Sequence, residues 1–265
     1  MAPFTERTPR VIAARRLHRR RDRDETGLFL AEGPQAVREA LAAGAVKELF
    51  ATDEARRRHP DLTAGATAVT EGAVAALAET VAPQGLVAVC HQRAVRLDAA
   101  LDGRPRLVAV LAEIRDPGNA GTILRTADAA GAGAVIFAGD AVDPYNGKCV
   151  RASAGSVFHT DVVRDGDPVR VVDRLRAAGL AVLAATGYGD TDLDDLADAG
   201  GLAAPTAWLF GSEAHGLPPA LLDRADRRVR VPLYGRAESL NLAAAAAVCL
   251  YTSARALRRP NPPRP

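Results

Sequence analysis

Three separated segments of this 265-residue chain place glycine, amide, carboxylate, hydroxyl and guanidinium groups directly after apolar runs. They are residues 119–125 (NAGTILR), 209–217 (LFGSEAHGL) and 231–242 (VPLYGRAESLNL). Each apolar run is typical of a buried strand, so we expect the polar groups to lie in loops at strand ends. In an open α/β sheet that edge is where ligands bind. The three segments therefore predict one ligand site built from distant parts of the chain.

Glycines in these segments indicate how such a ligand could be held. Gly211, Gly216 and Gly235 lie where the chain must turn tightly or let a ligand approach the backbone, which glycine permits because it has no side chain. Taken singly, each could be an ordinary turn glycine.

No Gly-x-Gly-x-x-Gly follows the first strand of either half of the chain, which disfavours a dehydrogenase and a conventional Rossmann-like methyltransferase.

Together the segments resemble the SpoU branch of the SPOUT methyltransferases, which transfer a methyl group from S-adenosylmethionine to a ribose 2'-hydroxyl of RNA. The family's motifs include Asn-x-Gly-x-x-x-Arg and Gly-x-Glu-x-x-Gly. The matching positions are Asn119, Gly121, Arg125, Gly211, Glu213, Gly216, Pro232, Ser239, Leu240 and Asn241. Departures fall on apolar positions, with Leu233 where the family often has Met and Leu242 where Val is common.

The resemblance implies a catalytic group at the strand ends. Its members would be Asn119, Arg125, Glu213, Ser239 and Asn241. Arg125 would activate the 2'-hydroxyl, either as a base with a strongly depressed pKa or as a fixed cation, because arginine otherwise keeps a pKa above about 12. Ser239 would position Arg125 and is also a good N-cap for the final helix. Glu213 would form a hydrogen bond with Asn119 or with nearby backbone. The alternative interpretation is that Arg125 is a surface arginine on a helix and Glu213 a solvated loop carboxylate.

The resemblance also implies that S-adenosylmethionine is held largely through the main chain of these loops. The positions expected to bind it are Thr186, Gly211, Glu213, Gly216, Val231, Leu233, Ser239, Leu240 and Asn241. His215 is of a residue type that often serves as a base, but it occupies a variable position of its motif, so we predict that it is not catalytic.

The elements that must position these groups form two α/β series. We predict a substrate-binding domain over 1–93, a linker over 94–105, a methyltransferase domain over 106–259 and a disordered tail over 260–265. The first series resembles L30e-like RNA binders and places strands at 28–31, 46–51, 66–69 and 86–90, with helices at 34–43 and 71–79.

The second series alternates strands with helices, which predicts a parallel sheet covered on both faces. Strands are expected at 107–112, 134–138, 161–164, 180–185, 206–210 and 229–233, and helices at 121–130, 146–157, 169–178 and 239–257. Periodicity alone predicts an unknotted topology. The resemblance instead implies a C-terminal trefoil knot around the cofactor.

Charge along the chain suggests a polyanionic partner. Residues 1–24 hold eight arginines against Glu6, Asp22 and Asp24, whereas the whole chain carries only +2. Such a segment is a plausible phosphate-contacting arm, or a solvated helix face in a protein that uses arginine as its ordinary cation. The predicted RNA contacts are Arg15, Arg16, Arg19, Arg20 and Arg151. Arg151 belongs to the stretch 148–155, which resembles the family's Lys-x-x-Arg-x-Ser-x-Gly segment; a plain helix face is the equal alternative.

Composition excludes several other classes. Cys90, Cys149 and Cys249 are odd in number and too far apart for Cys-x-x-Cys, so we expect buried thiols and no disulfide framework. The five histidines lack metal-ligand spacing, and no metal is predicted. No apolar run is long enough to span a membrane, so a cytoplasmic protein is expected.

These observations predict S-adenosylmethionine-dependent 2'-O-ribose methylation of RNA. The preceding domain type favours ribosomal RNA, and the resemblance implies a homodimer built around the cofactor region. A transfer RNA methyltransferase and a catalytically idle RNA-binding dimer of the same fold remain the alternatives. An α/β dehydrogenase is a more distant one.

Overall fold

The computed structural model describes residues 2–258 of the chain, so the predicted tail over 260–265 lies outside the described residues. The chain divides into two compact units. Unit 1 comprises the described residues up to Arg93 together with Asp143–His159. Unit 2 comprises Ala94–Val142 and the described residues from Thr160 onward. The loop between two strands of unit 2 is therefore structurally a part of unit 1.

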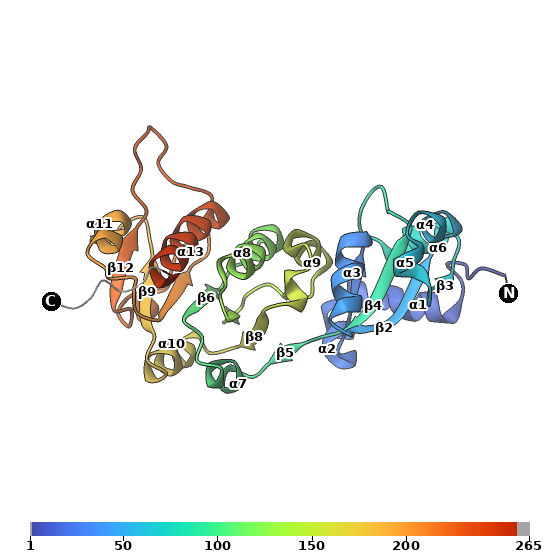
Figure 1. Cartoon of the computed structure of the whole chain (residues 1–265). Helices are drawn as coiled ribbons and strands as arrows, with labels where there is room; N and C mark the ends of the chain where they lie inside the picture. The colour runs from blue at the N-terminus through green and yellow to red at the C-terminus, as the bar shows by residue number, and fades with distance from the viewer. Residues whose placement is uncertain (1, 259–265) are drawn as a thin grey trace. The chain divides into compact units, whose positions relative to one another are not determined.

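Unit 1 is built on a mixed four-stranded sheet in the order β1-β4-β2-β3, in which β4 is antiparallel to both of its neighbours. Its strands are β1 (Leu28–Glu32), β2 (Val46–Ala51), β3 (Thr67–Ala68) and β4 (Leu86–His91). Its helices include α3 (Pro34–Ala42), α4 (Asp53–Arg58), α5 (Pro60–Thr63) and α6 (Glu71–Leu77) (Figure 1). The strands lie within two residues of the predicted ranges.

The arginine-rich N-terminal segment is helical. It forms α1 (Pro9–Arg15), the 3-10 turn η1 (Arg16–His18) and α2 (Arg20–Thr26). Val11, Ala14 and Leu17, three residues apart in turn, are buried in one cluster with side chains of the sheet and of α6. Arg15, Arg16, Arg19, Arg20 and Arg21 are exposed on other faces of this segment, whereas Arg23 is buried. The segment is thus a packed layer of unit 1 rather than a free arm.

The residues 143–159 were predicted to contain one helix over 146–157. The structure has α9 (Gly147–Ser153) followed by a 3-10 turn, η2 (Ser156–Phe158). Ala154 and Gly155 interrupt the helix because both have positive φ, 49° and 102°. The segment packs on β1 through aromatic rings, with the centroid of Phe29 4.8 Å from Tyr145 and 5.7 Å from Phe158.

Unit 2 contains an eight-stranded sheet in the order β10-β12-β9-β11-β6-β7-β8-β5, and every neighbouring pair is parallel. The strands are β5 (Ala94–Val95), β6 (Leu107–Ala112), β7 (Ala134–Ala138), β8 (Asp161–Asp165), β9 (Ala181–Ala185), β10 (Thr191–Asp192), β11 (Thr206–Phe210) and β12 (Arg227–Arg230). Every residue of β6, β7 and β11 is buried, which explains their unbroken apolar sequences. The predicted parallel α/β sheet is confirmed.

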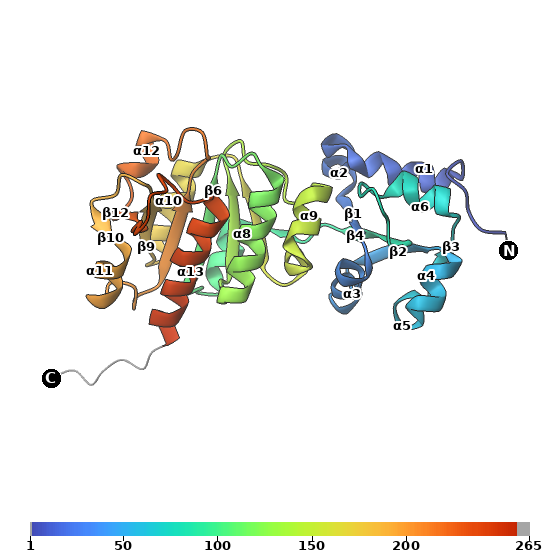
Figure 2. The ribbon, with the colours of Figure 1, turned by 90° about the horizontal axis from the view of Figure 1, so that it is seen from above.

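Helices cover both faces of this sheet. On one face α8 (Pro117–Ala130) packs against α13 (Leu242–Arg258), and both contact β6 (Figure 2). The other face holds a core built with α7 (Leu97–Asp102), α10 (Pro168–Ala177) and α12 (Pro219–Leu222). The short α11 (Leu193–Asp198) follows β10 and contacts α13.

Three local expectations differ from the structure. The stretch 94–105 contains β5 and α7, because Leu97, Ala100 and Leu101 lie on one helical face and are buried. The strand predicted over 229–233 ends at Arg230, since Pro232 has no N–H to donate to a ladder. The final helix begins at Leu242 rather than at residue 239. The proposed domain boundaries themselves stay a prediction.

No helix within residues 2–258 is long and apolar enough to cross a membrane. Over the same residues, no group of three or more His, Cys, Asp or Glu side chains is arranged to hold a metal ion.

The three cysteines are buried thiols, as predicted. Burial raises the pKa of Cys90 and of Cys249 to about 12. Because the thiolate is the nucleophile, about one molecule in ten thousand would carry it at either position at pH 8. We expect a disulfide reagent such as DTNB to leave Cys90 and Cys249 unlabelled in the folded protein and to label them after unfolding in guanidinium. Rapid labelling of either thiol under native conditions, located by peptide mass mapping, would contradict this.

Candidate active site

The three segments singled out in the sequence meet through a chain of side-chain hydrogen bonds. Asn119 donates from Nδ2 to Oε1 of Glu213, and Asn241 donates from Nδ2 to Oδ1 of Asn119 over 3.2 Å. These residues follow β6, β11 and β12, so the contact forms at the carboxyl edge of the parallel sheet. The expected bond between Glu213 and Asn119 is therefore present.

Asn119 is itself held by the start of α8. Asp116 is the N-cap of that helix, and its Oδ1 accepts the backbone N–H of Asn119 at 2.8 Å. Pro117 at the first helical position has the φ that a helix start requires. The backbone of Asn119 is thereby fixed, so its side-chain amide is free to join the other two loops.

Asn241, not Ser239, caps the final helix. Its Oδ1 accepts the backbone N–H groups of Ala243 at 2.9 Å and Ala244 at 3.3 Å. Serine and asparagine are comparable N-caps, so the sequence did not distinguish them. The amide of Asn241 caps the helix with its oxygen while its nitrogen donates to Asn119, and a serine hydroxyl could not make both contacts with the same geometry. The N-cap role predicted for Ser239 is wrong.

Arg125 lies on α8 and is exposed, and Ser239 is exposed on the loop 231–241 that joins β12 to α13. Within residues 2–258, no hydrogen bond joins Arg125 to Ser239, so the expected contact between them is not formed in the single chain. The physical reason is the loop itself, which projects from unit 2 with residues 233–241 exposed (Figure 1). The structure therefore joins Asn119, Glu213 and Asn241 by hydrogen bonds, and among the described residues no hydrogen bond links Arg125 or Ser239 to them.

The predicted cofactor positions lie on neighbouring strand ends and on the same loop. Thr186 follows β9, and its N–H donates to the carbonyl of Val229 on β12 over 2.9 Å. Gly211 follows β11, where an added Cβ would overlap Gly216 and the N–H of Leu217. Ser212 and Gly216 form an isolated antiparallel bridge, so these glycines let the loop fold tightly back on itself.

The remaining cofactor positions are half-buried or exposed. Val231 is half-buried, whereas Leu233 and Leu240 are 42% and 40% exposed. Exposed backbone, exposed aliphatic side chains and the amides of Asn119 and Asn241 thus share one edge of the sheet. S-adenosylmethionine requires apolar contacts for its adenine ring and polar contacts for its ribose and amino-acid part. This edge of the sheet supplies both kinds of contact. The residues present fit that cofactor.

Comparison with known proteins agrees with this geometry. The SpoU rRNA Methylase family matches residues 106–251, and the MRM3-like substrate binding domain matches residues 8–88. The chain belongs to the SpoU rRNA methylase family. The 23S rRNA (guanosine(2553)-2'-O)-methyltransferase RlmP of Bacillus subtilis is 39% identical over 240 residues, which cover 89% of this chain and 92% of that protein.

Solved structures of family members share the fold. The AdoMet-bound rRNA methyltransferase from Sinorhizobium meliloti superposes with a TM-score of 0.81 at 33% identity, covering 97% of this chain and 98% of that one. The SpoU methyltransferase AviRb from Streptomyces viridochromogenes, in complex with AdoMet, gives a TM-score of 0.81 at 32% identity over 94% of this chain and 98% of that one. The α/β fold with a small N-terminal unit is therefore the fold of SpoU methylases.

The predicted RNA-contacting arginines of this SpoU methylase differ in their environments. Arg15 and Arg19 are exposed, while Arg16 pairs with Asp22 at 3.0 Å and Arg20 pairs with Asp24 at 3.5 Å. Their contact with RNA stays a prediction. The pairs reduce the positive charge that the sequence alone suggested for this segment.

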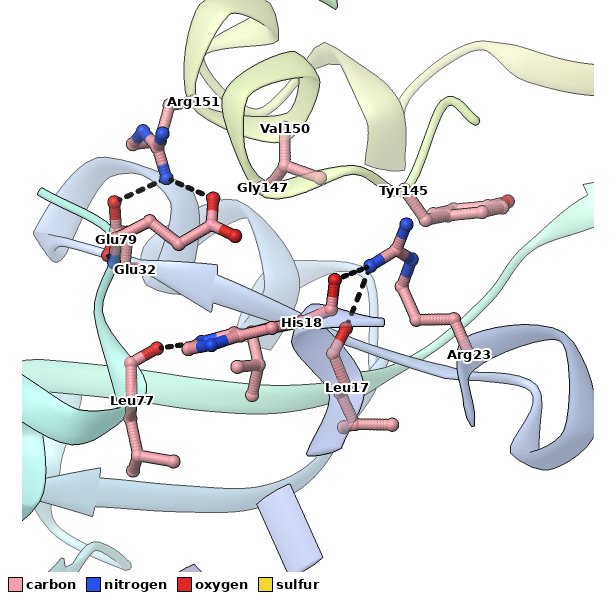
Figure 3. A pocket seen from close by; sticks show the side chains of 11 residues that line it. Leu17, His18, Arg23, Glu32, Leu77, Glu79, Tyr145, Gly147, Val150 and Arg151 are labelled. Atoms are coloured by element: carbon pink, nitrogen blue, oxygen red, sulfur yellow. Dashed lines mark hydrogen bonds and ion pairs between the residues drawn. The ribbon is translucent and has the colours of Figure 1, made fainter. Parts of the chain in front are cut away.

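Arg151 lies in unit 1, where it bridges two carboxylates. Its Nη1 is 2.8 Å from Glu32 and 3.1 Å from Glu79 (Figure 3). The side chain is 27% exposed and its charge is balanced by these partners. Nothing in the sequence near Arg151 indicated them, because Glu79 is 72 positions away.

The sequence reasoning also missed a buried ion pair in unit 1. Arg23 Nε donates to Asp143 over 2.7 Å, and the two side chains are only 4% and 3% exposed. The Nη1 of Arg23 donates to the carbonyls of Leu17 and His18, each at 2.8 Å (Figure 3). Arg23 belongs to the arginine-rich segment, but its role is to hold 143–159 against the N-terminal helices.

Proposed function

We propose that this chain transfers the methyl group of S-adenosylmethionine to a ribose 2'-hydroxyl of ribosomal RNA. The observation that carries the proposal is the hydrogen-bonded meeting of Asn119, Glu213 and Asn241 at the carboxyl edge of a SpoU methylase sheet. Similar proteins named as 23S rRNA 2'-O-methyltransferases and structures of relatives bound to AdoMet support it. The names of these relatives favour ribosomal over transfer RNA.

In this reaction S-adenosylmethionine supplies an electrophilic methyl group. The ribose 2'-oxygen would take the methyl carbon while the bond from that carbon to the sulfonium sulfur breaks with its electron pair on sulfur, and the hydroxyl proton would pass to solvent water. We assign Arg125 to the ribose side, where its guanidinium stabilises negative charge growing on the 2'-oxygen. The cofactor loops are held at the sheet edge by Asn119, Glu213 and Asn241. Ser239 positions Arg125 once the loop 231–241 has closed onto that arginine.

Two further features belong to the proposal. The loop 231–241 and α13 expose Leu233, Tyr234, Leu240, Val248 and Tyr251. A second copy of the chain that covered them would bury this apolar surface and bring the projecting loop to the catalytic edge. We therefore propose a homodimer, with the C-terminal trefoil knot of the family around the cofactor. Light scattering at micromolar concentration should give twice the 27.7 kDa chain mass, and a monomer would contradict it.

The function is tested by binding and by transfer. Calorimetry of the purified protein with S-adenosylmethionine should show saturable binding, and tritium from labelled cofactor should appear in ribosomal RNA. Transfer into transfer RNA instead would redirect the substrate assignment, and binding without any transfer would indicate an idle RNA-binding protein. Comparing ribose methylation in RNA from a deletion strain and its parent would locate the nucleotide.

A further inference from the structure

One guanidinium clamps the turn after β9 to the end of β12. Arg230 donates from Nη1 to the carbonyl of Gly189 over 3.0 Å and from Nη2 to Oδ2 of Asp192 over 3.2 Å. Arg230 is the last residue of β12, and the loop 231–241 starts directly after it. The same side chain therefore touches the turn that follows Thr186 and anchors the first residue of the cofactor loop.

The turn lies on β12 with no spare room. A Cβ added at Gly189 would be 2.6 Å from the backbone nitrogen of Arg230 and 2.7 Å from the carbonyl oxygen of Arg228. Glycine is needed here because of this close backbone approach rather than because of a positive φ. The turn and the strand end consequently form one body, with Thr186 on one side and Val231 on the other.

A second tie joins the loop to the start of α11. Asp192 caps that helix, and its Oδ1 accepts the N–H of Asp194 at 3.0 Å. The hydroxyl of Tyr234 donates to Oδ2 of Asp194, and this bond raises the pKa of Tyr234. Tyr234 is 85% exposed, so little packing holds its side chain there. Arg230 and Tyr234 thus flank Val231 and Leu233, and they are fastened to Asp192, the N-cap of α11, and to Asp194 in its first turn.

We propose that Arg230 and Tyr234 are positioning residues that preorganise the first half of the cofactor loop for S-adenosylmethionine. The inference rests on the proposed function, because it assigns a task within that cofactor site. Val231 and Leu233 lie on a chain whose following residues are exposed, so ordering it during binding costs conformational entropy. Two tethers remove part of that cost before the cofactor arrives, and the affinity rises accordingly.

The test compares cofactor affinity in matched variants of the full-length protein. Arg230→Met removes both donors, and Arg227→Met on the same strand is its control, because the Arg227 side chain is exposed and makes no hydrogen bond or ion pair with any described residue. Tyr234→Phe removes only the hydroxyl, and its affinity is compared with that of the wild-type protein. Calorimetry with S-adenosylmethionine gives Kd, and methylation assays separate KM for the cofactor from kcat.

We expect Arg230→Met to raise Kd about tenfold or more and Tyr234→Phe to raise it about threefold, as loss of one or two hydrogen bonds predicts. KM for the cofactor should follow Kd, while kcat at saturating cofactor stays within about twofold, because uniform binding is lost. Arg230→Lys should recover part of the affinity. The double variant Asp194→Ala with Tyr234→Phe should bind S-adenosylmethionine no more weakly than the single variants, because both substitutions remove the same hydrogen bond.

The outcomes are distinguishable. Wild-type affinity in Arg230→Met and Tyr234→Phe would overturn the inference and leave the proposed function standing. A lowered melting temperature with unchanged Kd would also overturn it, since it would reveal a purely structural clamp. Failure of the wild-type protein itself to bind S-adenosylmethionine would instead reject the proposed function.

Discussion

Replacing Arg125 by alanine is expected to lower the single-turnover rate of methyl transfer about 100- to 1,000-fold, the usual effect of removing one group that stabilises a developing oxyanion. Arg125 is the only cation on α8 and is exposed. Cofactor binding should be unaffected, because the proposed role lies on the ribose side. Rates measured at saturating S-adenosylmethionine and RNA isolate this step.

Lysine at the same position tests the electrostatic role assigned to Arg125 against the alternative role of a base. A fixed cation predicts that Arg125→Lys keeps appreciable activity and that its rate is flat near neutral pH. A base predicts that the wild-type rate rises with pH, because only the neutral guanidine accepts a proton. Arg174→Ala is the control, since Arg174 lies on α10, on the other face of the sheet, and pairs with Asp98. Near-wild-type transfer by Arg125→Ala would reject any chemical role.

Replacing Arg23 by methionine is expected to destabilise unit 1 by about 3–5 kcal/mol, because it leaves the carboxylate of Asp143 buried without its partner. Arg23 also satisfies two backbone carbonyls of the N-terminal helices, so three hydrogen bonds are lost together. Urea unfolding followed by circular dichroism measures the change as a shift of the first transition. The cofactor site lies in unit 2 and should keep its affinity under native conditions.

Arg16→Met is the matched control for this substitution. Arg16 pairs with Asp22 at 3.0 Å, and because Arg16 is 66% exposed although Asp22 is only 11% exposed, we expect its loss to cost about 1 kcal/mol, the upper end of the range for exposed pairs. If Arg23→Met is too unstable to purify, the double variant Arg23→Met with Asp143→Leu removes both charges and should recover part of the stability. Equal unfolding midpoints for Arg23→Met and Arg16→Met would show that the buried pair does not hold the segment 143–159.

Much of the fold followed from local sequence. The strands at 107–112, 134–138 and 206–210 were predicted because a strand buried on both faces needs an unbroken apolar run. Helix α10 likewise begins at Pro168, one residue from the predicted start at 169. In contrast, the stretch 94–105 was too short for its helical spacing to stand out from a linker.

The candidate site was predicted in part. Residue types in the three motifs identified Asn119, Glu213 and Asn241, and the structure joins them by hydrogen bonds. The choice of Asn241 over Ser239 as the helix cap could not be read from the sequence, since either residue suits that position. It was decided by Asn119, which lies 122 positions away and accepts the second bond of the Asn241 amide.

By itself, the sequence determined the family, the parallel sheet and the residue types gathered at its edge, because apolar periodicity and motif spacing are local properties of the chain. Only the tertiary structure decided which charges find partners. Arg23 and Arg151 looked like members of a basic surface, yet folding places one against Asp143 and the other between Glu32 and Glu79. Arg230 likewise belongs to no motif in the sequence, and its partners Gly189 and Asp192 become its neighbours only when the chain folds. An ion pair depends on distance in space, and position along the chain does not encode that distance for residues so far apart.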